Sequence, residues 1–193
     1  MDQQSYTPII EDASSAAVHP RQGLVTVFTG DGRGKTTAAI GTTLRAAGHG
    51  LRVLVVLFMK GPNFVHSETI ALRAFANVTL QSFGAPGWAI PGRDNTVHQL
   101  KAAEALAFIT GQIASQNYDL IVMDEVISAV HFGLLPEEAV VQLIKTKPLG
   151  LELIMTGRGA TAKVIESADL VTEMKCIKHP FERGIAARAG VDY

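Results

Sequence analysis

The sequence predicts a single α/β domain built on a mostly parallel sheet with helices on both faces. Two observations support this prediction. Short runs of aliphatic and β-branched residues alternate with helical segments along the chain, which is the order typical of parallel sheets. The run Leu51–Phe58 is apolar at nearly every position, and continuous runs of this kind are expected when both faces of a sheet are covered.

The individual elements follow in a regular order. A first strand is predicted at Leu24–Thr29, because a short β-rich run there ends in glycines. An alanine-rich helix follows at Thr36–Gly48 and is closed by glycines. Pro136 suits the first turn of a later helix, and the glycines and prolines of Gly84–Gly92 predict a loop. The remaining strands are predicted at Leu51–Phe58, Val78–Phe83, Leu120–Met123, Leu151–Met155 and Leu170–Ile177, and the remaining helices at Asn95–Gln116, from Pro136 to about Lys145, and at 160–167.

Composition and charge exclude several classes of protein. The chain has 193 residues, of which 47% are hydrophobic, and this is enough to bury the core of one domain. A net charge of -1 argues against a sequence-blind nucleic-acid binder, which would carry a clear basic excess. The most apolar run, Val53–Met59, is far shorter than the roughly 20 residues that a membrane span requires. We therefore expect neither nucleic acid nor a membrane as a partner.

The amino-terminal segment and the single cysteine favour a cytoplasmic setting. Residues 1–22 are polar and interrupted by prolines, and they lack the basic start and apolar stretch of a signal peptide. We expect them to form a mobile arm ahead of a domain that spans residues 23–193. Cys176 is the only cysteine, so it excludes an intramolecular disulfide, and we expect a small buried side chain near a strand end.

A glycine-rich segment between the first strand and the first helix predicts a phosphate-binding loop. The sequence TGDGRGKTT spans Thr29–Thr37, and its glycines allow backbone N–H groups to converge on phosphate oxygens. The helix N-terminus and Lys35 add positive charge, and Thr36 offers a hydroxyl to Mg²⁺. Thr29 stands where the usual pattern has its first glycine, so the loop is one residue tighter than a standard one. The candidate nucleotide-binding residues are Gly30, Asp31, Gly32, Arg33, Gly34, Lys35, Thr36 and Thr37.

Two carboxylates are predicted at the carboxyl end of a buried strand. Asp124 and Glu125 follow the apolar run Leu120–Met123, and ligands of open parallel sheets bind at this edge. An acidic pair after a strand is by itself usually a solvated strand end. Together with a phosphate loop about ninety residues earlier, the pair is better explained as a Mg²⁺ site.

These residues resemble a known family, the P-loop ATP:corrinoid adenosyltransferases, also called cob(I)alamin adenosyltransferases. The shortened loop is similar to theirs, and the likeness covers about residues 22–193. The combination of the tight loop, the TGRG turn and the carboxyl-terminal tail is specific, whereas one of them alone is weak. The matching segments are the loop and helix from Thr29 to Gly50, Phe58–Gly61, Asp124–Glu125, Leu135–Glu138, Thr156–Gly159 and the tail from Lys178 to Tyr193.

The resemblance implies a P-loop NTPase-like fold and a definite reaction. Reduced cobalt of a corrinoid, cobalamin or cobinamide, would attack C5′ of ATP, take the 5′-deoxyadenosyl group and release triphosphate. Position by position, it implies that Thr36 and Glu125 are Mg²⁺ ligands, that Lys35 is a phosphate ligand and that Asp124 is a near neighbour. Lys35, Asp124 and Glu125 are therefore the candidate catalytic residues, and no general base is needed because the nucleophile is the metal of the corrinoid.

The corrinoid side departs from the family pattern in two places. Trp88 matches an aromatic residue that the family places over the corrin face, but Pro86 stands where phenylalanine is usual. Ile127 occupies a position that is usually polar, so a hydrogen bond to nucleotide or metal is expected to be missing. Arg158, in the TGRG turn, fits a nucleotide contact and a strand-end cap about equally well.

Partners and alternative functions follow from the same resemblance. The polar arm lies where the family has a segment that covers a partner subunit's site, so a homodimer is expected, together with a reductase that supplies electrons. One alternative is a sensor or carrier that binds ATP or a corrinoid without turnover, which Pro86 and Ile127 keep open. Another is an ordinary P-loop phosphotransferase or NTPase, against which the shortened loop argues.

Overall fold

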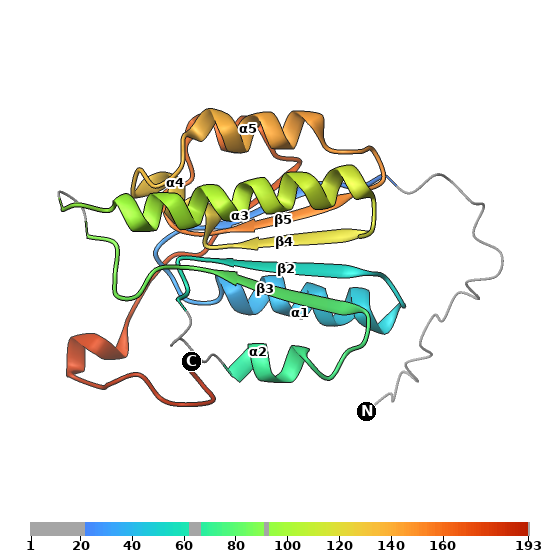
Figure 1. Ribbon diagram of the computed structural model, residues 1–193. Helices are drawn as coiled ribbons and strands as arrows, with labels where there is room; N and C mark the ends of the chain where they lie inside the picture. Colours follow the sequence, from blue (N-terminus) through green and yellow to red (C-terminus); the bar gives the residue numbers. More distant parts are fainter. Residues whose placement is uncertain (1–21, 62–66, 91–92, 193) are drawn as a thin grey trace, which may run out of the picture.

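The computed structural model describes residues 22–61, 67–90 and 93–192. Apart from Gln22, the expected amino-terminal arm lies outside this described part. The described residues form a parallel sheet of six strands in the order β3-β2-β4-β5-β1-β6, with helices on both faces (Figure 1). This confirms the predicted α/β class. The strands are β1 (Val25–Thr29), β2 (Val53–Phe58), β3 (Val78–Phe83), β4 (Leu120–Asp124), β5 (Glu152–Thr156) and β6 (Leu170–Glu173).

The helices divide into two sets because the central strands bury both of their faces. Along β2 the side chains alternate, so that Leu54, Val56 and Phe58 join one core cluster while Val53 and its alternate neighbours join the other. The helix α3 packs in the first cluster and α1 in the second, which accounts for the unbroken apolar run of β2. The helices are α1 (Lys35–Gly48), α2 (Ser67–Leu72), α3 (Thr96–Ser115), α4 (Val126–His131), α5 (Glu137–Thr146) and α6 (Ala162–Ser167), with a 3₁₀ turn at Pro180–Arg183.

Most predicted elements are present with ends shifted by one or two residues, and the differences have local causes. The short helices α2 and α4, of six residues each, were not predicted from the sequence. The last strand ends at Glu173 rather than at Ile177, since the main chain of Met174 leaves β6 to bond with the phosphate loop. Cys176 is consequently exposed, so the expectation of a buried thiol is wrong.

The topology brings the chemically interesting residues to one edge. All strands run parallel, so their carboxyl ends meet at the same side of the sheet. The strands β4, β5 and β1 are neighbours, and the Asp124–Glu125 pair, the Thr156–Gly159 turn and the phosphate loop follow them directly. In open sheets this edge is where ligands bind.

Candidate functional site

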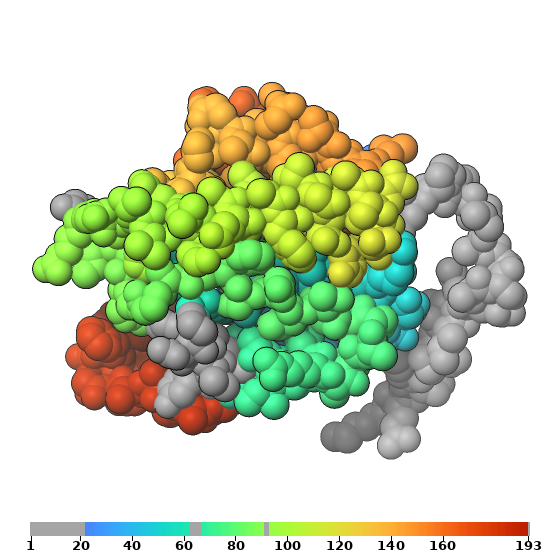
Figure 2. All heavy atoms as spheres, viewed as in Figure 1, coloured from blue at the N-terminus to red at the C-terminus, as the bar shows by residue number. Residues whose placement is uncertain are grey.

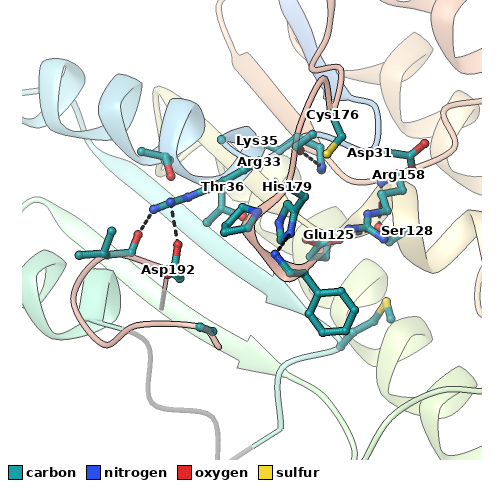
Figure 3. Close-up of a pocket in the computed structure, with 18 of the residues that line it drawn as sticks. Asp31, Arg33, Lys35, Thr36, Glu125, Ser128, Arg158, Cys176, His179 and Asp192 are labelled. Atoms are coloured by element: carbon teal, nitrogen blue, oxygen red, sulfur yellow. Dashed lines mark hydrogen bonds and ion pairs between the residues drawn. The ribbon is translucent and has the colours of Figure 1, made fainter. Parts of the chain in front are cut away.

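A large cleft lies at the carboxyl edge of the sheet, with a volume of about 1330 Å³. This exceeds the roughly 300–1,000 Å³ of a pocket for one small ligand, so the cleft is large enough for two substrates. Figure 3 shows Lys35, Glu125, Arg158 and His179 reaching into the same space from different segments. The cleft is lined by the phosphate loop, the ends of β2 and β4, the turn after β5, the loop at Gly87–Ala89 and much of the segment 175–192.

The ammonium of Lys35 closes the phosphate loop from inside. Its Nζ donates hydrogen bonds to the carbonyl oxygens of Gly30 and Gly32, both at 2.7 Å. Burial lowers the pKa of Lys35 from its ordinary value, an effect that nearby Arg158 reinforces and the carboxylate of Glu125 opposes. Lys35 stands at the first turn of α1, whose unpaired N–H groups favour an anion. The loop is thus preformed, and a phosphate that binds here competes with loop carbonyls for the ammonium.

The loop is tight because it packs against the segment that follows β6. The N–H of Gly32 donates to the carbonyl oxygen of Met174 at 2.7 Å, and the N–H of Met174 donates to that of Thr29 at 2.8 Å. Gly30 has a φ of 95°, and a Cβ there would lie 2.4 Å from the Met174 oxygen. A side chain at this position would therefore clash with backbone, so glycine is required.

Arg33, which lines the cleft, contacts the carboxyl-terminal tail. Its guanidinium forms an ion pair with Asp192 at 2.7 Å and donates a hydrogen bond to the carbonyl oxygen of Val191 (Figure 3). Asp192 also accepts hydrogen bonds from the side chain and the main chain of Arg188. Hydrogen bonding from Arg188, and then the charges of both arginines, lower the pKa of Asp192. The segment from Met174 to Asp192, which includes most of the tail, is therefore joined to the phosphate loop at both ends.

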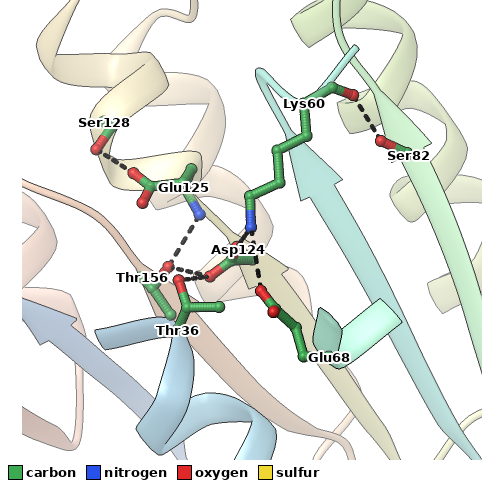
Figure 4. Close-up of polar contacts among 8 residues, drawn as sticks. All are labelled: Thr36, Lys60, Glu68, Ser82, Asp124, Glu125, Ser128 and Thr156. Atoms are coloured by element: carbon green, nitrogen blue, oxygen red, sulfur yellow. Dashed lines mark hydrogen bonds and ion pairs between the residues drawn. The ribbon is translucent and has the colours of Figure 1, made fainter. Parts of the chain in front are cut away.

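A buried hydrogen-bond network connects the ends of β4 and β5 to the first turn of α1 (Figure 4). The hydroxyls of Thr36 and Thr156 donate to Oδ1 of Asp124 at 2.9 and 2.7 Å. The N–H of Glu125 donates to the Thr156 oxygen at 2.9 Å. Asp124 and Thr156 are fully buried, so each bond replaces one that water would otherwise make. The network fixes the first turn of α1 relative to β4 and β5.

The backbone at Glu125 is held in an unusual conformation that presents its carboxylate to the cleft. Glu125 has a φ of 64°, in the left-handed region that non-glycine residues seldom adopt, and it caps α4. Its Oε2 accepts a hydrogen bond from the hydroxyl of Ser128 at 2.5 Å. The same hydroxyl oxygen accepts the N–H of Arg158 at 2.9 Å. Gly157 lets the two turns meet, since its φ is 141° and a Cβ would lie 2.3 Å from the Ser128 nitrogen.

The donor set at this end of the cleft consists of hard oxygens. Thr36 contributes a hydroxyl and Glu125 a carboxylate, which are ligand types that Mg²⁺ prefers. Among the described residues no group of three or more His, Cys, Asp or Glu side chains forms a metal site of its own. The residues therefore fit a cation that completes its coordination with phosphate oxygens and water, as Mg²⁺ does with nucleotides.

The other end of the cleft is apolar and open. Trp88 is 74% exposed. Ile177, just before the tail, is 90% exposed, and Phe181 on the tail is 77% exposed. In the space-filling view the tail, drawn in red, forms one corner of the molecule (Figure 2). Exposed large apolar side chains that line one cleft mark a binding surface rather than a core. Pro86 and Ile127 are not among the residues lining the cleft, and Ile127 is buried in the core.

The description of the matching family model is "ATP:corrinoid adenosyltransferase BtuR/CobO/CobP", and the model matches residues 21–193. The chain belongs to this adenosyltransferase family. It is 36% identical to the corrinoid adenosyltransferase of Escherichia coli K12 over 182 residues, which covers 94% of this chain and 91% of the relative. It is 34% identical to the corrinoid adenosyltransferase CobA of Salmonella typhimurium over 182 residues, with the same coverage of both chains. It is also 34% identical to the corrinoid adenosyltransferase of Pseudomonas aeruginosa over 185 residues, which covers 95% of this chain and 90% of the relative.

The adenosyltransferase brings its sequence-predicted site residues together. Asp31 to Thr37, Trp88, Glu125 and Arg158 all line the one cleft. Gly30 and Asp124 lie behind this lining, where they bond to Lys35 and Thr36. The roles assigned to these residues stay predictions. Sequence reasoning missed the contributions of Lys60, Thr156, Ser128 and the tail residue Asp192, although three of these four residues lie in segments that carry the family resemblance.

The described part of the adenosyltransferase contains no helix long and apolar enough to cross a membrane.

Proposed function

We propose that this adenosyltransferase transfers the 5′-deoxyadenosyl group of ATP to the reduced cobalt of a corrinoid and releases triphosphate. The observation that carries the proposal is the two-ended cleft. A preformed phosphate loop and two oxygen ligands stand at one end, and exposed apolar side chains that include Trp88 stand at the other. Such a cleft suits one polyanionic substrate and one large substrate with an apolar face.

In the proposed reaction no protein side chain forms a covalent bond to a substrate. The cobalt electron pair forms a bond to C5′, the bond between C5′ and the triphosphate oxygen breaks, and that oxygen keeps the bonding electrons. No proton moves in this step, so the site needs no general base. The protein must hold C5′ in line with the cobalt and stabilise the charge that develops on the leaving oxygen.

Charge stabilisation is assigned to the phosphate loop. The N–H groups at the start of α1 and the ammonium of Lys35 are fixed donors, and fixed donors need no reorganisation as the triphosphate departs. Thr36 and Glu125 are proposed to hold Mg²⁺, which would supply further neutralisation of the triphosphate. Asp124 would orient the Thr36 hydroxyl without binding the phosphates itself.

Substrate positioning is assigned to the open end of the cleft. Trp88 and the apolar tail side chains are proposed to contact the face of the corrin ring and to keep water from the cobalt. Their exposure means that this surface is covered only when the substrate, or a partner subunit, is bound. We also propose a homodimer, an electron-donating reductase and a cytoplasmic setting, since the cobalt must arrive reduced.

An anaerobic assay tests the proposal. The purified protein is mixed with MgATP and chemically reduced cobalamin, the cobalt–carbon bond is followed by its absorption spectrum, and the phosphate product is identified. Formation of adenosylcobalamin with one equivalent of triphosphate is expected. Binding of ATP without alkylation would indicate a sensor or carrier, and release of ADP would indicate an ordinary NTPase. Either result would overturn the proposal.

A further inference from the structure

The carboxylate of Asp124 is fully buried, and both of its oxygens are engaged within the protein. Oδ1 accepts the hydroxyls of Thr36 and Thr156. Oδ2 accepts a hydrogen bond from the ammonium of Lys60 at 2.8 Å (Figure 4). A carboxylate offers about four lone pairs, so three bonds use most of this capacity before any ligand arrives.

The backbone fixes Lys60 for this contact. Lys60 comes soon after β2, and Met59 between them has a φ of 60°, a conformation that non-glycine residues rarely adopt. The carbonyl oxygen of Lys60 accepts a hydrogen bond from the hydroxyl of Ser82 at 2.6 Å, which ties the turn to the end of β3. The Lys60 side chain is only 13% exposed, and Glu68 provides a second carboxylate 3.9 Å from the ammonium.

This arrangement differs from that of a P-loop protein whose acidic residue binds the metal. There, the carboxylate opposite the loop holds Mg²⁺ directly or through water. Here the ammonium of Lys60 occupies the second oxygen of that carboxylate. A divalent cation placed against the same oxygen would meet a positive charge at contact distance, and this repulsion is strong in a site with little water.

We propose that Lys60 is a positioning residue that keeps the divalent cation off Asp124 and leaves it to Thr36, Glu125 and the triphosphate. The inference rests on the proposed function, because it concerns the metal that accompanies ATP. The ammonium of Lys60 balances the charge of the Asp124 carboxylate inside the protein, so Asp124 acts only as a hydrogen-bond acceptor. The Thr36 hydroxyl donates a hydrogen bond to Asp124, which leaves its oxygen lone pairs for the cation. The cation therefore binds as a complex with ATP, and the nucleotide-free protein has little affinity for it.

The substitution Lys60→Met tests this role, because it removes the charged amino group and keeps an unbranched side chain of nearly the same length. Mn²⁺, used in place of Mg²⁺, is titrated into nucleotide-free protein and the free ion is measured by electron paramagnetic resonance. We expect Lys60→Met to bind Mn²⁺ roughly tenfold more tightly than the wild type, since Asp124 becomes available. MgATP, measured by calorimetry, is expected to bind roughly tenfold more weakly, because the cation is drawn away from Glu125.

Three matched variants make the result specific. Lys60→Arg keeps the charge and is expected to bind Mn²⁺ as the wild type does. Lys60→Met combined with Asp124→Asn removes both charges and should lose the gain in Mn²⁺ affinity. Lys101→Met removes a lysine from an exposed pair with Glu104 and is expected to change neither affinity. If Lys60→Met does not fold, Lys60→Gln carries the same test, since it also removes the charge beside Asp124 and keeps a polar side chain there.

The outcomes separate this inference from the proposed function. A folded Lys60→Met protein that binds Mn²⁺ no better than the wild type would overturn the role of Lys60. If Lys60 had only a structural role, Lys60→Met would lower stability without raising the affinity for Mn²⁺. That result would also overturn the proposed role of Lys60. Both binding measurements omit the corrinoid. A wild-type protein that fails to alkylate cobalt would overturn the proposed function. The Mn²⁺ and MgATP affinities of the Lys60 variants could still be compared with those of the wild type.

Discussion

The two ends of the cleft are built in opposite ways. At the nucleotide end, Asp124, Thr156 and Lys35 are buried, and their polar groups are bonded to one another or to the loop. At the other end, which we propose binds the corrinoid, Trp88 and Phe181 stand largely in solvent. The nucleotide end is therefore assembled by folding itself, whereas the proposed corrinoid end is expected to be completed by its ligand. Substitutions at the first end should affect stability and ATP binding, and those at the second end should affect the corrinoid alone.

The largest expected effect is that of Lys35→Met at the nucleotide end. The variant loses a fixed charge that we propose faces the triphosphate in the transition state. Removal of one such donor typically lowers kcat by roughly 10²–10³-fold, and we expect a loss of that size together with weaker ATP binding. The measurements are the rate of adenosylcobalamin formation and ATP calorimetry. Wild-type turnover in this variant would show that the loop does not stabilise the leaving group.

Thr156→Val is expected to have the next largest effect, and it acts on stability as well as on binding. The variant removes a donor from fully buried Asp124 and an acceptor from the N–H of Glu125. Asp124 keeps the hydrogen bonds from Thr36 and Lys60, so the N–H of Glu125 is the group left unsatisfied. One unsatisfied buried group costs about 1–3 kcal/mol, and we expect a loss of unfolding free energy in that range. Denaturant unfolding measures it. The control Thr146→Val, at the exposed end of α5, should change stability by less than about 0.5 kcal/mol.

The nucleotide end was also the easier end to predict from sequence, for a physical reason. Phosphate binding needs glycines, a lysine and a hydroxyl at fixed spacing next to a helix start, so residues 29–37 carry a local signal. The partners of Asp124 cannot be found in this way. Lys60 and Thr156 lie 64 and 32 residues away along the chain, and only the parallel order of β2, β4 and β5 brings them together.

The tail was predicted least well, because its conformation depends on contacts rather than on pattern. The apolar and β-branched residues before Ile177 favoured a longer strand, but the bonds of Met174 with Thr29 and Gly32 end β6 at Glu173. The exposure of Cys176 follows from this departure. A local pattern cannot show that a chain leaves a sheet to satisfy the backbone of another loop.

Trp88→Ala tests the corrinoid end and should leave the nucleotide end unchanged. Because Trp88 is largely exposed, its removal creates no cavity, and stability and ATP affinity are expected to stay at wild-type values. The KM for cobalamin is expected to rise about tenfold through the loss of aromatic contact with the ring. Leu149→Ala removes an exposed apolar side chain that does not line the cleft and serves as the control. An unchanged KM would remove Trp88 from the corrinoid site.

The smallest expected effect concerns the contact that joins the two ends, the ion pair of Arg33 with Asp192. Exposed pairs contribute little, so Arg33→Met and Asp192→Asn should each speed hydrogen exchange of the tail only about twofold to fivefold. If the pair acts as a unit, the double variant should exchange no faster than the single ones. The matched pair Arg52 and Asp119, at the opposite edge of the sheet, should leave tail exchange unchanged when neutralised.

The charge of Asp192 also gives the pH dependence of this contact. Hydrogen bonds from Arg188 lower the pKa of Asp192 below its ordinary value of 3.8. The Asp192 carboxylate is therefore protonated less readily in the folded protein than in the unfolded chain. The contact is therefore at full strength above pH 3.8, and it is lost as the pH falls through the lower pKa that Asp192 has in the folded protein. Exchange of the tail, corrected for the intrinsic rate, should be constant from neutral pH down to that range. A rise near neutral pH would show that another group holds the tail against the phosphate loop, and the two ends of the cleft would then be joined differently.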